Sequence, residues 1–232
     1  MIKKIFKKIL GKDRGAIDNF VTSLKPEIKN FKTVLDVGSY HGDFIAEILR
    51  YNAALSIHAF EPFKESFDFI NERFAKNTRL KLHHAAVSDI KGMAILNINA
   101  FKETNSLLES ENVDKNINLL TKQQSTEKVE VINLDEYCNK NGIDFIDLIK
   151  IDTQGNSFNV LKGLDRMLTG KKINYLYVEA EFTEIYKNEK LFSEIELLMR
   201  SYDYSIVKIY NLNYINKKQL GWCDVLFSPK NM

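Results

Sequence analysis

The residues best suited to chemistry begin in one short turn, Asp36-Val37-Gly38-Ser39-Tyr40-His41-Gly42, at the end of an apolar run. Gly38 lets the backbone approach a ligand closely, because a Cβ at this point would collide with it. Gly42 lets a helix start beside the ligand, with free backbone N–H groups facing a carboxylate. Asp36 is placed to accept from the ammonium group of an amino-acid moiety. The same turn would equally suit a protein that binds NAD, or a tight turn that binds no ligand.

A second carboxylate follows about one strand–helix unit later, where Phe60-Glu61-Pro62 ends another apolar run. Glu61 can take both hydroxyls of a ribose in charge-assisted hydrogen bonds. NAD enzymes and S-adenosylmethionine enzymes share this feature, so it indicates an adenosine ligand and leaves the reaction open. The alternative is an acid that caps a helix beside the helix-starting Pro62.

A third polar point, Ala86-Val87-Ser88-Asp89, ends the next apolar run. Asp89, or the backbone around Ser88, is placed to meet an adenine amino group. An ordinary polar β-turn would explain both residues as well.

The fourth point is Lys150-Ile151-Asp152-Thr153-Gln154-Gly155. Asp152 is expected to face the reacting group, as an orienting acid or as a base. Lys150 can pair with Asp152 or reach the substrate. Glu179 and Glu181 follow a later strand and fall on the same rim, where they either orient a polyhydroxylated acceptor or lie as solvated charges.

Alternating strands and helices must position these residues. The apolar runs predict strands over 33–37, 55–60, 80–87, 147–151, 173–180, 204–210 and 222–228, helices over 16–30, 44–50, 66–75, 134–140, 157–168 and 191–202, and extended segments over 94–98 and 128–134. This rhythm predicts a Rossmann-like α/β domain, with a mainly parallel seven-stranded sheet covered by helices on both faces. The closing strand pair adds an antiparallel edge, and ligands are expected at the carboxyl ends of the strands.

A long polar stretch over 101–127 interrupts the rhythm, and stretches of this length are often functional. We expect it to act as a lid that folds over the acceptor and excludes water. Ser106 in this stretch is then expected to contact the cofactor or the acceptor.

Composition narrows the class of protein. The 232 residues are 44% hydrophobic and carry a formal net charge of only +2, which favours a single globular domain over a dedicated nucleic-acid binder. Cys138 and Cys223 fit no metal-ligand spacing and are expected to be reduced. No segment is apolar enough to predict a membrane span or a signal peptide, so a cytoplasmic protein is expected. Residues 2–12 form a basic amphipathic pattern that either packs on the domain or touches an anionic membrane.

Together these motifs resemble the FkbM family of S-adenosylmethionine-dependent methyltransferases. The resemblance rests on the four points above, with Gly92 and Val160-Leu161-Lys162-Gly163, and it extends over residues 33–228. It implies a class I methyltransferase that methylates oxygen, often a sugar hydroxyl or a natural product. The cofactor-binding residues that it implies are Asp36, Gly38, Ser39, Gly42, Glu61, Pro62, Ser88 and Asp89.

One residue departs from the family pattern, because Gln154 stands where an acid is usual. Gln keeps the hydrogen bonding but cannot carry a negative charge or take a proton. We therefore expect Asp152 as catalytic base or orienter, with His41 as second candidate and as loop residue otherwise. Lys150, Gln154, Ser106, Glu179 and Glu181 are expected on the acceptor side, and no metal is expected.

Three other functions fit parts of the sequence. A nicotinamide-dependent oxidoreductase would need a Gly-x-Gly-x-x-Gly turn, which is absent after Leu35. A nucleic-acid methyltransferase would need clustered basic residues, and these are dispersed outside the first twelve positions. A scaffold that binds cofactor without turnover is suggested only by Gln154. The sequence favours a small-molecule or glycan acceptor and gives no oligomeric state.

Overall fold

The computed structural model describes residues 20–230. The basic pattern at residues 2–12 and the first part of the helix expected over 16–30 lie outside this range. The remainder of that helix is interrupted at Leu24, just before Pro26, and continues as α3 (Lys25–Ile28). No helix within residues 20–230 is long and apolar enough to cross a membrane.

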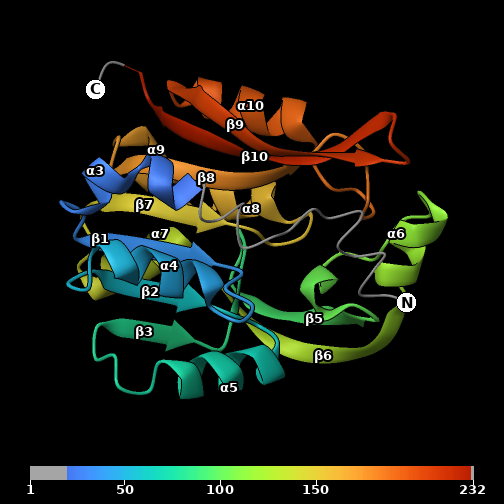
Figure 1. Cartoon of the computed structure of the whole chain (residues 1–232), viewed down its shortest axis with the longest axis horizontal. Coiled ribbons are helices and arrows are strands. Elements are labelled where there is room, and N and C mark those ends of the chain that lie inside the picture. Colours follow the sequence, from blue (N-terminus) through green and yellow to red (C-terminus); the bar gives the residue numbers. More distant parts are fainter. Residues whose placement is uncertain (1–19, 231–232) are drawn as a thin grey trace.

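A seven-stranded sheet forms the centre of the domain (Figure 1). Its strands, in spatial order, are β3 (Leu80–His83), β2 (Ser56–Phe60), β1 (Thr33–Val37), β7 (Ile146–Ile151), β8 (Ile173–Glu181), β10 (Gln219–Pro229) and β9 (Tyr204–Ile215). The first five pair in parallel, and β10 runs antiparallel to both β8 and β9. This is the predicted sheet with antiparallel pairing at one end. Both closing strands are longer than predicted, because their pairing extends to Ile215 and Gln219.

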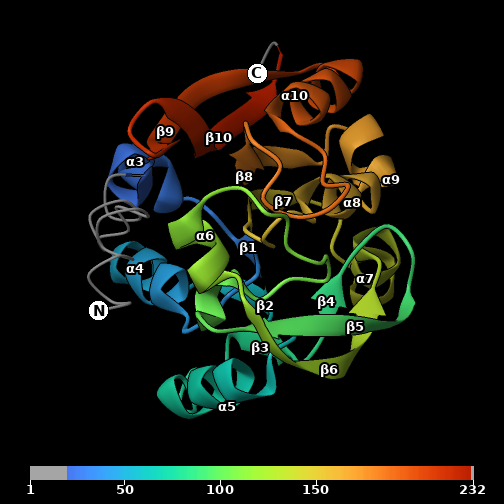
Figure 2. The same cartoon turned by 90° about the vertical axis from the view of Figure 1, so that its right-hand side faces the viewer.

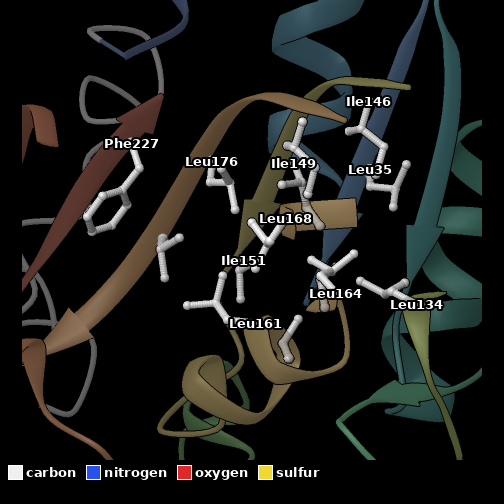
Figure 3. Packing of buried hydrophobic residues seen from close by; sticks show 14 of the residues in the cluster. Leu35, Leu134, Ile146, Ile149, Ile151, Leu161, Leu164, Leu168, Leu176 and Phe227 are labelled. Atoms are coloured by element: carbon white, nitrogen blue, oxygen red, sulfur yellow. The ribbon is translucent and has the colours of Figure 1, made fainter. Parts of the chain in front are cut away.

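Helices cover the two faces of this sheet, as predicted. One face packs against α3, α4 (Asp43–Tyr51) and α5 (Lys64–Arg73). The other packs against α7 (Leu134–Asn141), α8 (Ser157–Lys162), α9 (Asp165–Thr169) and α10 (Phe192–Ser201). Figure 3 shows aliphatic side chains from this second face, where Ile149, Ile151 and Leu176 of the sheet meet Leu161 of α8 and Leu168 of α9. The central strands are apolar toward both layers, as burial between helices requires.

Two predicted elements are each divided in the structure. The strand expected over 80–87 breaks after His83, because β3 pairs with β2 whereas β4 (Ala86–Val87) pairs with β6 (Gln123–Ile132) in a second sheet. The helix expected over 157–168 breaks between α8 and α9 at Gly163. A Cβ on Gly163 would lie 2.7 Å from the carbonyl oxygen of Ser88, so the chain passes close to the end of β4 here.

The second sheet has the order β4-β6-β5, in which β5 (Gly92–Asn99) is antiparallel to β6. The polar stretch over 101–127 contains the 3-10 helix η1 (Lys102–Thr104), helix α6 (Lys115–Leu120) and the first residues of β6. Ile117 of α6 packs with Tyr186 and Trp222, so the stretch docks on the domain. Figure 2, which looks onto the carboxyl ends of the parallel strands, shows β5, β6 and α6 in front of that edge.

Candidate active site

A cavity of about 230 Å³ lies at the carboxyl ends of β1, β2 and β7. Its wall combines the turn after β1, the turn after β2, the end of β7 and residues of η1 and the following loop. The predicted site residues that line it are Gly38, Ser39, His41, Glu61, Pro62, Ser106, Lys150, Asp152 and Gln154. The structure thus brings together motifs that are more than 100 residues apart in the chain, at the edge where ligands of such sheets bind.

The turn after β1 has the backbone conformation that its glycines predict. Gly38 and Gly42 have φ angles of +79° and +73°, and Gly42 is the residue before α4. The reason for Gly38 differs from the expected one. A Cβ on Gly38 would lie 1.8 Å from the carbonyl oxygen of Asp152, so it is the neighbouring strand end that requires glycine. A Cβ on Gly42 would meet the ring of Phe74 at 2.7 Å, within the protein.

Asp36, Lys150 and Asp152 form a chain of charges beneath the cavity. Lys150 Nζ lies 3.5 Å from Asp36 Oδ1 and 3.5 Å from Asp152 Oδ2, and it donates to the carbonyl oxygen of Gly38 at 3.1 Å. Asp36 is fully buried, and burial raises the pKa of its carboxyl above the usual range while Lys150 opposes the rise. Lys150 therefore connects the turn after β1 to the end of β7. Two roles were predicted for Lys150, and the structure shows one of them, the pairing with Asp152.

Glu61 braces the same turn. Its Oε2 accepts from the backbone N–H of Tyr40 at 2.6 Å, and its Oε1 accepts from the N–H of Phe63 at 2.9 Å. Only 6% of Glu61 is exposed, and burial raises the pKa of its carboxyl to about 8 in spite of these hydrogen bonds. Each oxygen of a carboxylate can accept more than one hydrogen bond, so the group can still take two ribose hydroxyls.

One end of the cavity is apolar and the other is polar. Phe60, Ala85, Ala86, Val87, Leu96 and Leu107 line the apolar end, which suits a flat heteroaromatic ring. Asn156 also lines the cavity, and its Nδ2 donates to the carbonyl oxygen of Val87 at 3.0 Å. Sequence reasoning missed Asn156, which had only its place after Gly155 to suggest it.

Ser88 and Asp89, which were expected at the adenine, lie outside the cavity, and Asp89 contacts other residues of the protein. Asp89 accepts from Lys162 Nζ at 3.0 Å and from Ser88 Oγ at 3.2 Å. These contacts join the end of β4 to α8, so a role in adenine binding stays a prediction for both residues.

The polar end carries Asp152, Gln154, Tyr177, Asn211 and Asp224. Tyr177 Oη donates to Asp224 Oδ2 at 2.9 Å, and Asn211 Nδ2 donates to the same oxygen at 2.6 Å. Tyr177, Asn211 and Asp224 come from three neighbouring strands, and only the pairing of β8, β10 and β9 brings them together. They gave no signal in the sequence, because Tyr177 and Asp224 stand within expected strands and Asn211 directly follows one.

Glu179 and Glu181 are only 4% and 3% exposed, so they are not solvated rim charges. Both line a second cavity of about 40 Å³, together with Tyr186 and Trp222. Burial raises the pKa of Glu181 well above its usual range, and Glu189 adds to the effect.

His41 lies at the mouth of the main cavity. Its ring stacks on Tyr40 with centroids 3.8 Å apart and lies 4.6 Å from the ring of Phe69. Partial burial lowers the pKa of His41, which favours the neutral imidazole at pH 7. Among the described residues, no three His, Cys, Asp or Glu side chains are grouped so as to hold a metal ion.

Comparison with known proteins decides the family. The sequence pattern of the methyltransferase FkbM domain matches residues 36–206, which is most of the chain. The chain belongs to the FkbM methyltransferase family. It is also 26% identical over 176 residues to the 2-O-methyltransferase NoeI of Sinorhizobium fredii, covering 73% of this chain and 72% of that protein.

A solved structure with a TM-score of 0.50 agrees with this fold. A candidate RNA methyltransferase from Pyrococcus horikoshii matches with a TM-score of 0.50 and 11% identity, over 93% of this chain and 84% of that one. TrmK of M. capricolum, solved with S-adenosylhomocysteine, matches with a TM-score of 0.46 and 14% identity, over 90% and 67%. At 11% identity the likeness to the Pyrococcus horikoshii protein concerns the fold alone, which is the one expected of a class I methyltransferase. The TM-score of the TrmK match is too low to support a conclusion.

The cofactor of this FkbM methyltransferase is S-adenosylmethionine, and the cavity fits it. The apolar end suits the adenine, and Glu61 lies beside it for the ribose hydroxyls. Gly38, Ser39 and Tyr40 of the turn after β1 also line the cavity, where the amino-acid end of the cofactor is expected. Asp36 and Gly42 do not line the cavity, and Asp36 is fully buried beside Lys150, so their expected contacts with the amino-acid end of the cofactor stay predictions.

Proposed function

We propose that this FkbM methyltransferase transfers the methyl group to a hydroxyl oxygen of a sugar, glycan or similar polyhydroxylated molecule. The observation that carries the proposal is the carboxylate of Asp152, which lines the cavity and is only partly exposed. The polar end around it offers carboxylates, amides and a phenol, the groups that bind hydroxyls. The likeness to a 2-O-methyltransferase supports the same choice of acceptor atom.

When bound, S-adenosylmethionine would supply an electrophilic methyl group, whose bond to the sulfonium sulfur breaks and leaves neutral S-adenosylhomocysteine. Asp152 accepts the proton of the acceptor hydroxyl while the oxygen forms its bond to carbon. Lys150, 3.5 Å away, keeps Asp152 charged before the proton arrives. The remaining contribution is alignment of the acceptor oxygen, which the residues of the polar end provide. The neutral His41 at the cavity mouth is the second candidate for the base.

The stretch over 101–127 acts in this proposal as the cover of the acceptor. Lys102, Glu103, Asn105, Ser106 and Leu107 line the cavity from this side. Ser106 is buried, and its Oγ donates to the carbonyl oxygen of Gln154 at 2.6 Å. We propose that this contact fixes the cover to the end of β7 and excludes water during transfer.

The test is a screen for S-adenosylhomocysteine release with free sugars and oligosaccharides, followed by Asp152→Asn on the best acceptor. We expect the variant to lose at least about 100-fold in kcat, because a general base contributes about 10²–10⁴-fold. Its affinity for S-adenosylhomocysteine should stay within about threefold of the wild type, whereas Glu61→Ala should lose that affinity. Full turnover by Asp152→Asn would exclude Asp152 as the base. Transfer to nitrogen or carbon acceptors alone would exclude O-methylation.

A further inference from the structure

Gln154 lies between the two cavities and contributes to the wall of both. Its backbone has a φ of +52°, which is unusual for a residue other than glycine. The Ser106 hydroxyl holds its carbonyl oxygen, and the next residue, Gly155, has no room for a Cβ beside Tyr186 and Glu189. The chain is thus held so that the side chain of Gln154 points between two carboxylates.

The amide of Gln154 makes three hydrogen bonds. Its Nε2 donates to Asp152 Oδ1 at 2.9 Å and to Glu179 Oε2 at 2.6 Å. Its Oε1 accepts from the hydroxyl of Tyr186 at 3.0 Å, a residue that is only 2% exposed. The opposite amide orientation would place a carbonyl oxygen against both carboxylates, so these neighbours fix which end is which.

The surroundings of this amide are strongly acidic. On this side the main cavity is lined by Lys150 and Asp152 at the end of β7, Tyr177 of β8 and Asp224 of β10. The second cavity is lined by Glu179 and Glu181 of β8 and by Tyr186, whose N–H donates to Glu189, and Glu103 of η1 lines both cavities. A neutral donor that serves two carboxylates stabilises the charged form of both. A third carboxylate at this point would retain a proton to a pH well above the ordinary pKa of a glutamate, since like charges in direct contact oppose its ionisation.

We propose that Gln154 is a positioning residue that holds Asp152 and Glu179 charged at the same time and fixes their geometry next to the transferred methyl group. The inference rests on the proposed function, in which Asp152 faces that group. Gln154 does not itself take the proton, because an amide is not a base at neutral pH. It keeps the base ready and aligned, and it keeps Glu179, which lines the second cavity, ionised behind the base.

The cofactor and its product provide a test that needs no acceptor. S-adenosylmethionine carries a positive sulfonium where S-adenosylhomocysteine carries a neutral thioether, and the two are otherwise alike. The ratio of their dissociation constants, measured by calorimetry from pH 5.5 to 8.5, therefore reports the negative charge near the sulfur. The variants are Gln154→Glu, which adds an acid, and Gln154→Met, which removes the donor at similar size. Gln124→Glu adds the same acid at an exposed position of β6 and serves as the control.

We expect Gln154→Glu to match the wild-type ratio at pH 5.5 and to favour S-adenosylmethionine by at least about threefold more at pH 8.5, as the added acid ionises. At pH 7, Gln154→Met should lose at least about threefold of the wild-type preference for S-adenosylmethionine over S-adenosylhomocysteine. Without the amide donor, either Asp152 or Glu179 then keeps a proton. Gln124→Glu should follow the wild type. Unchanged S-adenosylhomocysteine affinity will show that each variant is folded.

Two results would overturn the inference alone. If both Gln154 variants followed the wild-type ratio at every pH, the amide would have no influence on charge at the site. If the control variant shifted the ratio as much as Gln154→Glu, the effect would belong to the net charge of the protein. If the wild type bound neither compound, the proposed function would fail together with the inference, which distinguishes that outcome from the other two.

Discussion

Glu61 is a carboxylate whose burial suits a ligand but lowers the stability of the cofactor-free protein. Its two oxygens accept from backbone N–H groups, yet burial dominates and raises its pKa to about 8. Between its ordinary value of 4.5 and about 8, the folded state holds a proton that the unfolded state has released. Folding stability must therefore fall as pH rises through this interval. Ribose hydroxyls that donate to Glu61 stabilise the ionised form and reverse the loss.

The first prediction concerns this pH dependence. The unfolding free energy of the cofactor-free protein should fall between pH 5.5 and pH 8, with Glu61 contributing about 2–3 kcal/mol to the fall. Glu61→Gln should remove that part of the slope, whereas Glu72→Gln, at an exposed position of α5, should leave it. Urea titrations at several pH values provide the measurement. Parallel slopes for all three proteins would show that Glu61 titrates at its ordinary pKa.

The second prediction concerns Lys150, whose ammonium lies between two carboxylates in the interior. Lys150→Met should cost about 2–4 kcal/mol of unfolding free energy, because it leaves Asp36 buried without its cation. The double variant Asp36→Asn with Lys150→Met should recover at least about 1 kcal/mol, since the uncompensated charge is gone. Denaturant unfolding of the wild type, both single variants and the double variant gives the coupling. Additive losses would show that the two side chains do not interact.

At the scale of the element, the strand-to-helix turn after β1 depends on a glycine for reasons of packing. Gly38→Ala would place a Cβ 1.8 Å from the backbone oxygen of Asp152 and would require a left-handed backbone. We expect a loss of about 2–5 kcal/mol in unfolding free energy, with weaker binding of S-adenosylmethionine as β1 and β7 separate.

The matched control for this third prediction is Gly142→Ala. Gly142 ends α7 with a φ of +64°, and no atom lies within 4 Å of the added Cβ. Only the backbone conformation is then penalised, at about 1–2 kcal/mol. Equal losses for the two variants, measured by thermal unfolding, would contradict the close approach of β1 and β7.

At the scale of the whole molecule, two sheets meet around one cavity. The seven-stranded sheet supplies the turn after β1 and the end of β7, while the segment between β5 and β6 supplies the opposite wall. A ligand in the cavity therefore contacts both parts of the domain at once. Binding should stabilise these parts together.

The fourth prediction is a pattern of amide hydrogen exchange. S-adenosylhomocysteine should protect residues 38–43 and 102–107, and it should leave the turn between β9 and β10 unchanged, because that turn does not line the cavity. At a ligand concentration of about 100 times Kd, binding contributes about 2.7 kcal/mol of stability. Protection of the first segment without the second would show that the cover does not close over the cofactor.

Much of the architecture was predictable because it depends on local pattern. Apolar runs of five to eight residues between helical periods mark strands that are buried on both faces, and the positions of β1, β2, β7 and β8 follow from them. The glycine turn after Asp36 and the acid of Phe60-Glu61-Pro62 mark strand ends, and strand ends of a parallel sheet share one edge. The meeting of Gly38, Glu61 and Asp152 at one cavity was therefore determined by the sequence itself.

Only the tertiary structure decided the contacts between segments that are distant in the sequence and have no local pattern in common. The strand expected over 80–87 breaks because β4 pairs with β6, which lies about 40 residues farther along the chain. The burial of Glu179 and Glu181 and the three hydrogen bonds of Gln154 depend on how β8 and the following loop pack against the end of β7. A side chain's type states what it can donate or accept. Its partners are chosen by long-range packing, which no local pattern encodes.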